Sequence, residues 1–146
     1  MRENSRPAPE TLEQFLDSTL DSVDRAEELA LGVAQRAGFE DEDLTKIGLA
    51  VRESMVNAVV HGNRYNAHKR VHFSVIQEKA RFTVKISDQG EGFEVADLPD
   101  PLAPENLLRT SGRGLFLVRS FMDEVRIERM GSGGMEVTLV KLAVSK

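Results

Sequence analysis

Hydrophobic positions recur first at helical spacing and later at strand spacing along this chain. Between residues 23 and 37 the apolar positions follow a helical period, with Asp21 or Ser22 as the candidate N-cap and Gly38 as the terminator. Four acidic residues at 40–43 then open a second predicted helix that runs to Gly62, because negative side chains are favourable at the positive end of a helix. The first half of the chain is therefore predicted to be mainly helical.

Alternating apolar and polar residues predict strands in the second half. Segment 11–19 alternates only in part, which is compatible with a first strand or with the start of a helix. Residues 131–134 contain three glycines and are predicted to form a turn. The remaining elements predicted from the pattern are strands at 72–77 and 81–87 joined as a hairpin through 78–80, a helix at 114–122, and strands at 124–130 and 135–144.

Helices followed by hairpin-linked strands indicate an α+β fold rather than a doubly wound one. We expect a two-layer α/β sandwich, with a mixed, mostly antiparallel sheet and helices on one face. Residues 1–10 are predicted to be a disordered lead, and 11–146 a single domain. Residues 94–111 contain three prolines and little periodicity, so they are predicted to form a long loop of the length of an active-site lid.

Composition excludes several classes of function. The chain has 146 residues and no cysteine, which rules out disulfides, thiolate zinc sites and cysteine nucleophiles. No apolar run approaches the length of a membrane span, so we expect a cytoplasmic protein without membrane contact. A net charge of −5 disfavours direct nucleic-acid binding, and the basic residues around 64–70 are more simply a solvated loop than a binding patch.

The predicted second helix carries the first candidate site. Glu53, Asn57 and His61 are spaced four residues apart and form one polar stripe. The carboxamide of Asn57 could complete the coordination of a phosphate-bound Mg²⁺, and Glu53 could orient a water or hydroxyl group for attack on a γ-phosphate. Alternatively, both are ordinary solvent-facing helix residues. The stripe borders the predicted apolar face, which consists of Ile47, Val51, Ser54 and Ala58.

Two glycine-rich blocks follow the hairpin. Asp88 stands at a strand end before Gly90 and Gly92, where backbone could approach a flat ring while the carboxylate accepts a hydrogen bond from an exocyclic amine, as adenine would offer. Gly112 and Gly114 open a predicted helix, whose free N–H groups suit a phosphate. A capped turn and a glycine hinge explain the same residues equally well in isolation. The chain has no Walker-type phosphate loop.

In this order, the blocks resemble the nucleotide-binding motifs of the GHKL ATPase superfamily. The runs N-A-V-V-H-G-N, D-x-G-x-G-F, D-P-L-A-P-E-N-L-L and S-G-R-G-L-F-L-V-R-S-F-M-D-E-V are most similar to bacterial anti-sigma-factor serine/threonine kinases. The resemblance implies a Bergerat-type sandwich that binds ATP and Mg²⁺, with Glu53 as the general base, Asn57 as the magnesium ligand and Asp88 as the adenine-reading acid. The other nucleotide-binding residues it implies are Gly90, Gly92, Phe93, Arg109, Gly112, Arg113, Gly114, Leu115 and Thr138.

The resemblance also implies partners. A kinase of this kind would phosphorylate a serine of a small anti-anti-sigma protein of the STAS type, bind a sigma factor in alternation with it, and form a homodimer. The alternative is an ATP-gated binding protein with little or no kinase activity. An intact Glu53 favours the kinase, because a pure binder has no need of a base one turn from the metal ligand.

Overall fold

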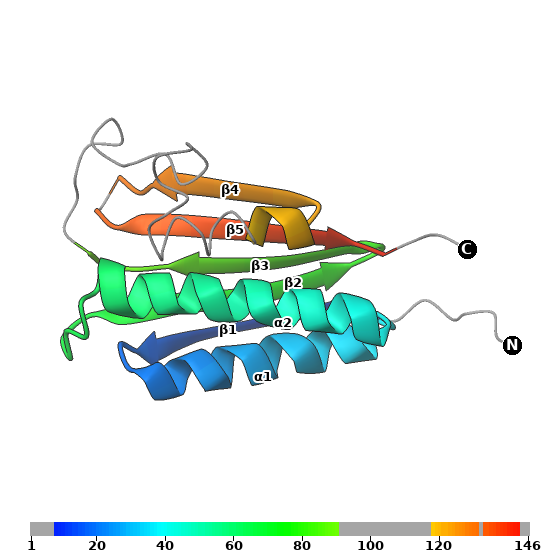
Figure 1. Cartoon of the computed structure of the whole chain (residues 1–146), viewed down its shortest axis with the longest axis horizontal. Helices are drawn as coiled ribbons and strands as arrows, with labels where there is room; N and C mark the ends of the chain where they lie inside the picture. The colour runs from blue at the N-terminus through cyan, green and yellow to red at the C-terminus, as the bar shows by residue number, and fades with distance from the viewer. Residues whose placement is uncertain (1–7, 91–117, 132, 144–146) are drawn as a thin grey trace, which may run out of the picture.

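The computed structural model describes residues 8–90, 118–131 and 133–143, and Figure 1 shows their arrangement. In chain order the elements are β1 (Glu10–Asp17), α1 (Leu20–Arg36), α2 (Asp41–Val56), the π-helix η1 (Asn57–Gly62), β2 (Arg70–Glu78), β3 (Arg81–Ser87), β4 (Glu124–Arg129) and β5 (Met135–Leu142).

The five strands form one sheet in the order β1-β2-β3-β5-β4. Every described strand pair is antiparallel, which agrees with the expected mostly antiparallel sheet. The β2–β3 and β4–β5 pairs are hairpins, and antiparallel neighbours are what short turns produce. Segment 11–19 contains a strand and no helix, since β1 pairs with β2 along its whole length.

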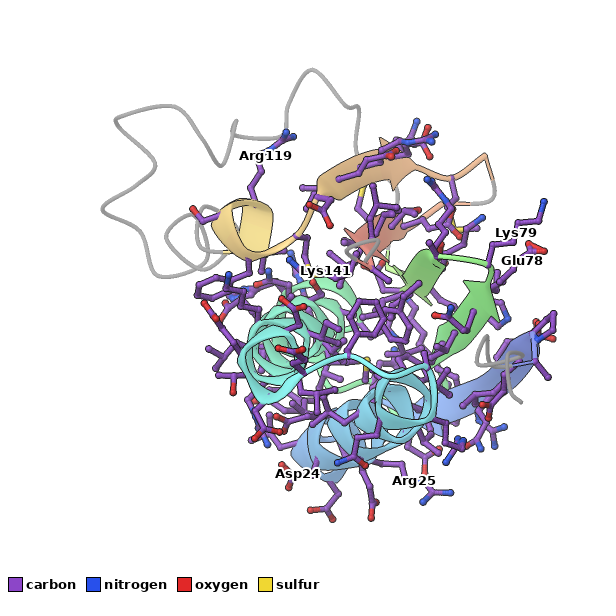
Figure 2. All side chains as sticks on the ribbon, turned by 90° about the vertical axis from the view of Figure 1, so that its right-hand side faces the viewer. Asp24, Arg25, Glu78, Lys79, Arg119 and Lys141 are labelled. Atoms are coloured by element: carbon purple, nitrogen blue, oxygen red, sulfur yellow. The ribbon has the colours of Figure 1, made fainter. Side chains whose placement is uncertain are left out.

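Both helices cover the same face of the sheet (Figures 1 and 2). Alternate residues of the central strands point toward them, as Phe73, Val84 and Leu139 do, and all three are completely buried. The core therefore lies between one helical layer and one face of the sheet, which confirms the two-layer α+β class. None of the described helices is long and apolar enough to cross a membrane.

The first helix begins slightly earlier than the sequence pattern indicates. Thr19 is the N-cap in extended conformation and Leu20 the first helical residue, so Asp21 and Ser22 lie inside the helix. At the other end Gly38 has φ +93°, its N–H donates to Gln35, and the N–H of Phe39 donates to Ala34. This double hydrogen bond is a Schellman motif, which explains why the helix stops at the predicted glycine.

The second helix ends at Gly62 as predicted, but its last six residues form a π-helix. The N–H of Asn63 donates to the carbonyl of Ala58 at 2.8 Å, which is the i to i+5 bond of that geometry. Single π-turns within helices are rare and occur often at functional sites. This π-helix begins at Asn57, a residue of the first candidate site.

Other boundaries agree with the predictions to within a few residues. The last strand ends at Leu142, and β1 begins at Glu10, inside the segment predicted as a lead. Of the predicted helix 114–122, the described part is helical over 118–121. The predicted loop 94–111 lies outside the described residues.

Two neighbouring residues of α2 test the position of the core. Ile47 is completely buried, whereas Leu49 is 47% exposed on the same helix. We expect Ile47→Ala to lower the free energy of unfolding by about 2–5 kcal/mol through lost burial and a cavity. Leu49→Ala, the matched control, should change it by less than about 0.5 kcal/mol. Urea unfolding followed by circular dichroism gives both values, and equal effects would contradict the assigned helix faces.

Candidate functional site

The polar stripe of α2 lies beside the buried face, as predicted. Ile47 and Val51 are completely buried, while Glu53 and Asn57 are partly exposed. Burial raises the pKa of the Glu53 carboxyl, and the nearby charge of His61 opposes that rise. A carboxylate with a raised pKa holds a proton more readily near neutral pH, which suits a general base.

The side chain of Asn57 has an unusual environment. Its Oδ1 and Nδ2 atoms are both buried, and neither has a hydrogen-bond partner among the described residues. A buried amide without partners costs about 1–3 kcal/mol, so such a group in a folded protein calls for a functional explanation. The carboxamide sits one helical turn after Glu53, where an oxygen ligand for a metal is expected.

A Mg²⁺ ion fits this donor chemistry. In the described part of the chain, no group of three or more His, Asp or Glu side chains could hold a metal by itself. An ion at Asn57 would therefore need phosphate oxygens and water as further ligands, which is the usual arrangement for magnesium at nucleotide sites.

Asp88 lies directly after β3 on the helix-covered side of the sheet, and it is buried. Its Oδ1 accepts hydrogen bonds from the N–H groups of Gly90 at 2.9 Å and Met135 at 3.2 Å. Burial raises the pKa of the Asp88 carboxyl, and the two backbone hydrogen bonds and the charge of Lys69 oppose that rise. Both described bonds use Oδ1, whereas the second oxygen, Oδ2, lies against Gly62.

Three glycines from separate segments surround Asp88. A Cβ on Gly62, at the end of the π-helix, would lie 2.4 Å from Oδ2 of Asp88, and one on Gly134, in the β4–β5 turn, would lie 2.1 Å from its carbonyl oxygen. A Cβ on Gly90 would lie 2.6 Å from the carbonyl oxygen of Gly62. The helix end, the strand end and the turn can meet at this carboxylate only because none of the three residues has a side chain.

Thr138 is not brought to this carboxylate. On β5 it is paired with Lys85 of β3, whereas Val137 is paired with Ile86 and points toward the helices. Because successive side chains of a strand point to opposite faces, Thr138 lies on the sheet face away from Asp88. The residue of β5 that contacts Asp88 is Met135. The structure therefore does not support the adenine-reading role that the resemblance implies for Thr138.

The structure describes only part of the predicted site. Glu53, Asn57, Asp88 and Gly90 are described, and the contact between Gly62 and Asp88 brings the end of their helix to the end of β3. Gly62, Asn63 and Gly134 contact or adjoin Asp88 and were missed by the sequence reasoning, and the signal for the two glycines was their position at the end of an element. The predicted residues outside the described part are Gly92, Phe93, Arg109, Gly112, Arg113, Gly114 and Leu115.

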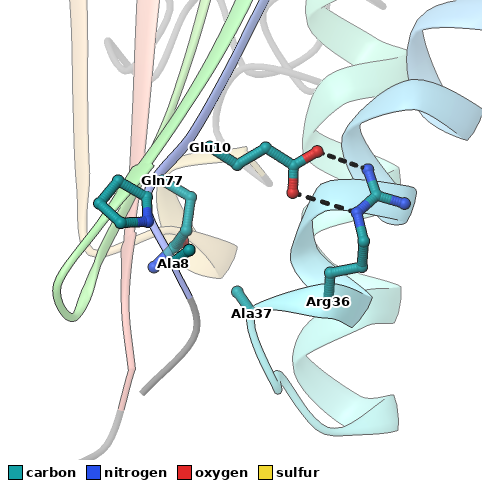
Figure 3. A pocket seen from close by; sticks show the side chains of 6 residues that line it. Ala8, Glu10, Arg36, Ala37 and Gln77 are labelled. Carbon is teal, nitrogen blue, oxygen red and sulfur yellow. Dashed lines mark hydrogen bonds and ion pairs between the residues drawn. The ribbon is translucent and has the colours of Figure 1, made fainter.

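A shallow pocket of about 480 Å³ lies at the opposite end of the sheet (Figure 3). Glu10 and Arg36 form a two-bonded ion pair at its edge. Glu10 pairs with Gln77 at one end of β1 and β2, whereas Asp88 follows the other end of β3, so this pocket is separate from the candidate site. Its lining residues are Ala8, Pro9, Glu10, Arg36, Ala37 and Gln77.

Comparison with known proteins agrees with this geometry. The family model described as "Histidine kinase-like ATPase domain" matches residues 16–141. The anti-sigma F factors of Bacillus thuringiensis (strain Al Hakam) and Bacillus mycoides (strain KBAB4) are each 38% identical over 104 residues, covering 68% of this chain and 70% of the relative.

Two solved structures share the fold. The crystal structure of the RsbU and RsbW domains of Rv1364c from Mycobacterium tuberculosis superposes with a TM-score of 0.62 at 20% identity, over 94% of this chain and 34% of that one. The mycobacterial sensor histidine kinase MprB gives a TM-score of 0.56 at 16% identity, over 95% of this chain and all of that one. The chain thus spans about a third of the first solved chain.

The glycine at the β4–β5 turn gives a direct test of the site's packing. Gly134 has φ +84°, and an added Cβ would collide with the Asp88 backbone. We expect Gly134→Ala to lower the free energy of unfolding by at least about 1 kcal/mol, because the left-handed conformation and the collision both penalise a side chain. Gly131→Ala in the same turn, with nothing within 4 Å, should stay within about 0.5 kcal/mol of the original chain. Chemical denaturation measures both, and a harmless Gly134→Ala would contradict the close approach.

Proposed function

The chain belongs to the histidine kinase-like ATPase domain family, and from that membership we propose that it is an ATP-binding anti-sigma kinase. It transfers the γ-phosphoryl group of ATP to a serine of a small anti-anti-sigma protein of the STAS type, and it thereby regulates a sigma factor. Its relatives are anti-sigma F factors, which supports the sigma-factor side of this proposal.

The observation that carries the proposal is the buried carboxamide of Asn57, which has no hydrogen-bond partner among the described residues. An oxygen ligand prepared in this way, one turn from the partly buried Glu53, is what a metal-bound triphosphate requires and what a protein without a nucleotide would have no reason to keep. The same helical run ends at Gly62 against Asp88, so the helix that carries the proposed metal ligand meets the end of β3 at the proposed base-reading group.

Each described residue has a definite role in this proposal. Oδ2 of Asp88 accepts a hydrogen bond from the adenine amine, and Gly90 allows the backbone to approach the ring. Glu53 accepts the proton of the attacking serine hydroxyl as the new oxygen–phosphorus bond forms and ADP departs with the electrons of the broken bond. Asn57 would hold Mg²⁺, which supplies charge stabilisation to the transferred phosphoryl group when bound.

The remaining predicted residues complete the proposal from outside the described part of the chain. Gly92 and Phe93 would continue the adenine pocket, and Gly112, Gly114 and Leu115 would hold the phosphates at a helix start. Arg109 and Arg113 are the two candidates to contact the γ-phosphate. Residues 94–111 would form the lid of a single ATPase domain that covers 11–146.

We propose a cytoplasmic homodimer as the working form. The sheet face that carries no helices exposes Phe15, whose side chain is 60% accessible and lies against the ring of His72 at 4.9 Å. Leu142, which is 46% exposed, lies on the same face, and several exposed apolar side chains on one face are typical of a surface that a partner covers. A second copy of the chain is the partner implied by the family resemblance.

Removing the proposed base separates catalysis from binding. We expect Glu53→Gln to lower transfer of label from γ-labelled ATP by at least about 100-fold, because general base catalysis supplies about 10² to 10⁴ in rate. ATP affinity should be little changed, since glutamine keeps the size of the side chain. The assay uses Mg²⁺ and the small proteins of the native lysate as acceptors.

Glu42→Gln is the matched control for this experiment. Glu42 lies in the first turn of the same helix, is exposed and pairs with Lys46, so its variant should transfer phosphate like the unmodified chain. Equal transfer by Glu53→Gln would remove the base from the mechanism. Tight ATP binding with no transfer by the unmodified chain would make the protein an ATP-gated binder instead of a kinase.

A further inference from the structure

Asn63 is a buried polar residue directly after the π-helix, and it joins three separate segments. Only 2% of its surface is exposed. Its Nδ2 donates to Oγ of Ser18 at 2.9 Å, and its Oδ1 accepts from the N–H of Gln89 at 2.7 Å. The β1–α1 junction, the helix end and the segment after β3 are thus linked through one side chain.

The hydrogen bonds continue beyond Asn63 on both sides. Oγ of Ser18 donates to the carbonyl of Lys69 at 2.6 Å, and the side-chain oxygen of Gln89 accepts from the N–H of Arg70. Both extensions reach the chain just before or at the start of β2. Both polar atoms of the Asn63 side chain therefore bond to a residue that makes a further hydrogen bond to Lys69 or Arg70.

The direction of these bonds requires a carboxamide. Ser18 gives its only hydroxyl proton to Lys69, so Oγ can only accept from residue 63. The backbone N–H of Gln89 can only donate, so residue 63 must present an acceptor there. Asparagine meets both demands at once, whereas aspartate would place a carboxylate oxygen against the lone pairs of Ser18.

This arrangement fixes the peptide group that follows Asp88. The N–H of Asp88 donates to Met135, and its carboxylate accepts from Met135 and Gly90. Asn63 accepts from the next N–H along the chain, that of Gln89. Gly62, adjacent to Asn63, is the residue whose missing side chain makes room for the carboxylate.

We propose that Asn63 is a positioning residue for base recognition: through Gln89 it sets the orientation of the Asp88 carboxylate, and through Ser18 it ties that orientation to the β1–α1 junction. The inference rests on the proposed function, in which Asp88 reads adenine. Asn63 does not touch the nucleotide, so its effect is on selectivity between bases. ATP presents an amine to the Asp88 oxygen where GTP presents a carbonyl oxygen, and a misplaced carboxylate distinguishes the two less well.

The test compares the unmodified chain with Asn63→Ala, Ser18→Ala and the control Ser22→Ala. Ser22 is a buried serine of the same junction whose hydroxyl lies 3.4 Å from Thr19 and does not contact Asn63. Two quantities are measured: amide hydrogen exchange at Gln89 and Asp88 without nucleotide, and the ratio of ATP to GTP affinity by calorimetry with Mg²⁺.

In Asn63→Ala we expect exchange at Gln89 to accelerate by at least about tenfold while Asp88 keeps its protection, and the ATP-to-GTP affinity ratio to fall by about tenfold. Ser18→Ala should change both in the same direction but less, and Ser22→Ala should change neither. If Asn63→Ala does not fold, Ser18→Ala provides the test, because it removes the hydroxyl oxygen to which Asn63 donates and leaves Asn63 in place.

Unchanged selectivity in a folded Asn63→Ala, with the unmodified chain preferring ATP, would overturn the positioning role alone. An unmodified chain that binds neither nucleotide would overturn the proposed function and the inference with it. A loss of selectivity in Ser22→Ala equal to that in Asn63→Ala would assign the effect to general destabilisation, and would likewise overturn the inference.

Discussion

The burial of the Asp88 carboxylate is the constraint on which the rest of the site depends. A carboxylate removed from water is costly unless hydrogen bonds replace its hydration, and here two backbone N–H groups do so on one oxygen. The space around it is so limited that Gly62 and Gly134 cannot carry a side chain. Helix end, strand end and hairpin turn must therefore converge on a single group.

The strand register and the position of the helical layer bring these three segments together. The β3–β5 register places Ser87 opposite Glu136, so the next residues, Asp88 and Met135, meet where the paired strands end. The helical layer lies over the same face, and the π-turn from Asn57 to Gly62 brings its last residue against the carboxylate. The proposed catalytic residue Glu53 and the proposed base-reading residue Asp88 therefore come from two elements that are far apart in sequence.

Much of the fold was predictable from spacing alone, whereas the packing of the site was not. The helical period identified Ile47 and Val51 as core, and alternation identified the hairpins, because burial of one face produces both patterns. The π-turn and the contacts of Gly62 and Gly134 depend on residues distant in sequence, so no local pattern reveals them. Thr138 shows the same limit: a motif match places a residue in a strand, but only the register decides which face it occupies.

Binding of Mg-ATP by the unmodified chain and by Asp88→Asn tests the central claim most directly. Because Oδ1 of residue 88 must accept from two N–H groups, asparagine would turn its amide nitrogen toward the adenine amine, donor against donor. Isothermal calorimetry should show ATP binding below millimolar concentration by the unmodified chain and a loss of at least about tenfold in the variant. No binding at millimolar Mg-ATP, or equal affinity in both proteins, would contradict the assignment of Asp88 as the base-reading group of a nucleotide site.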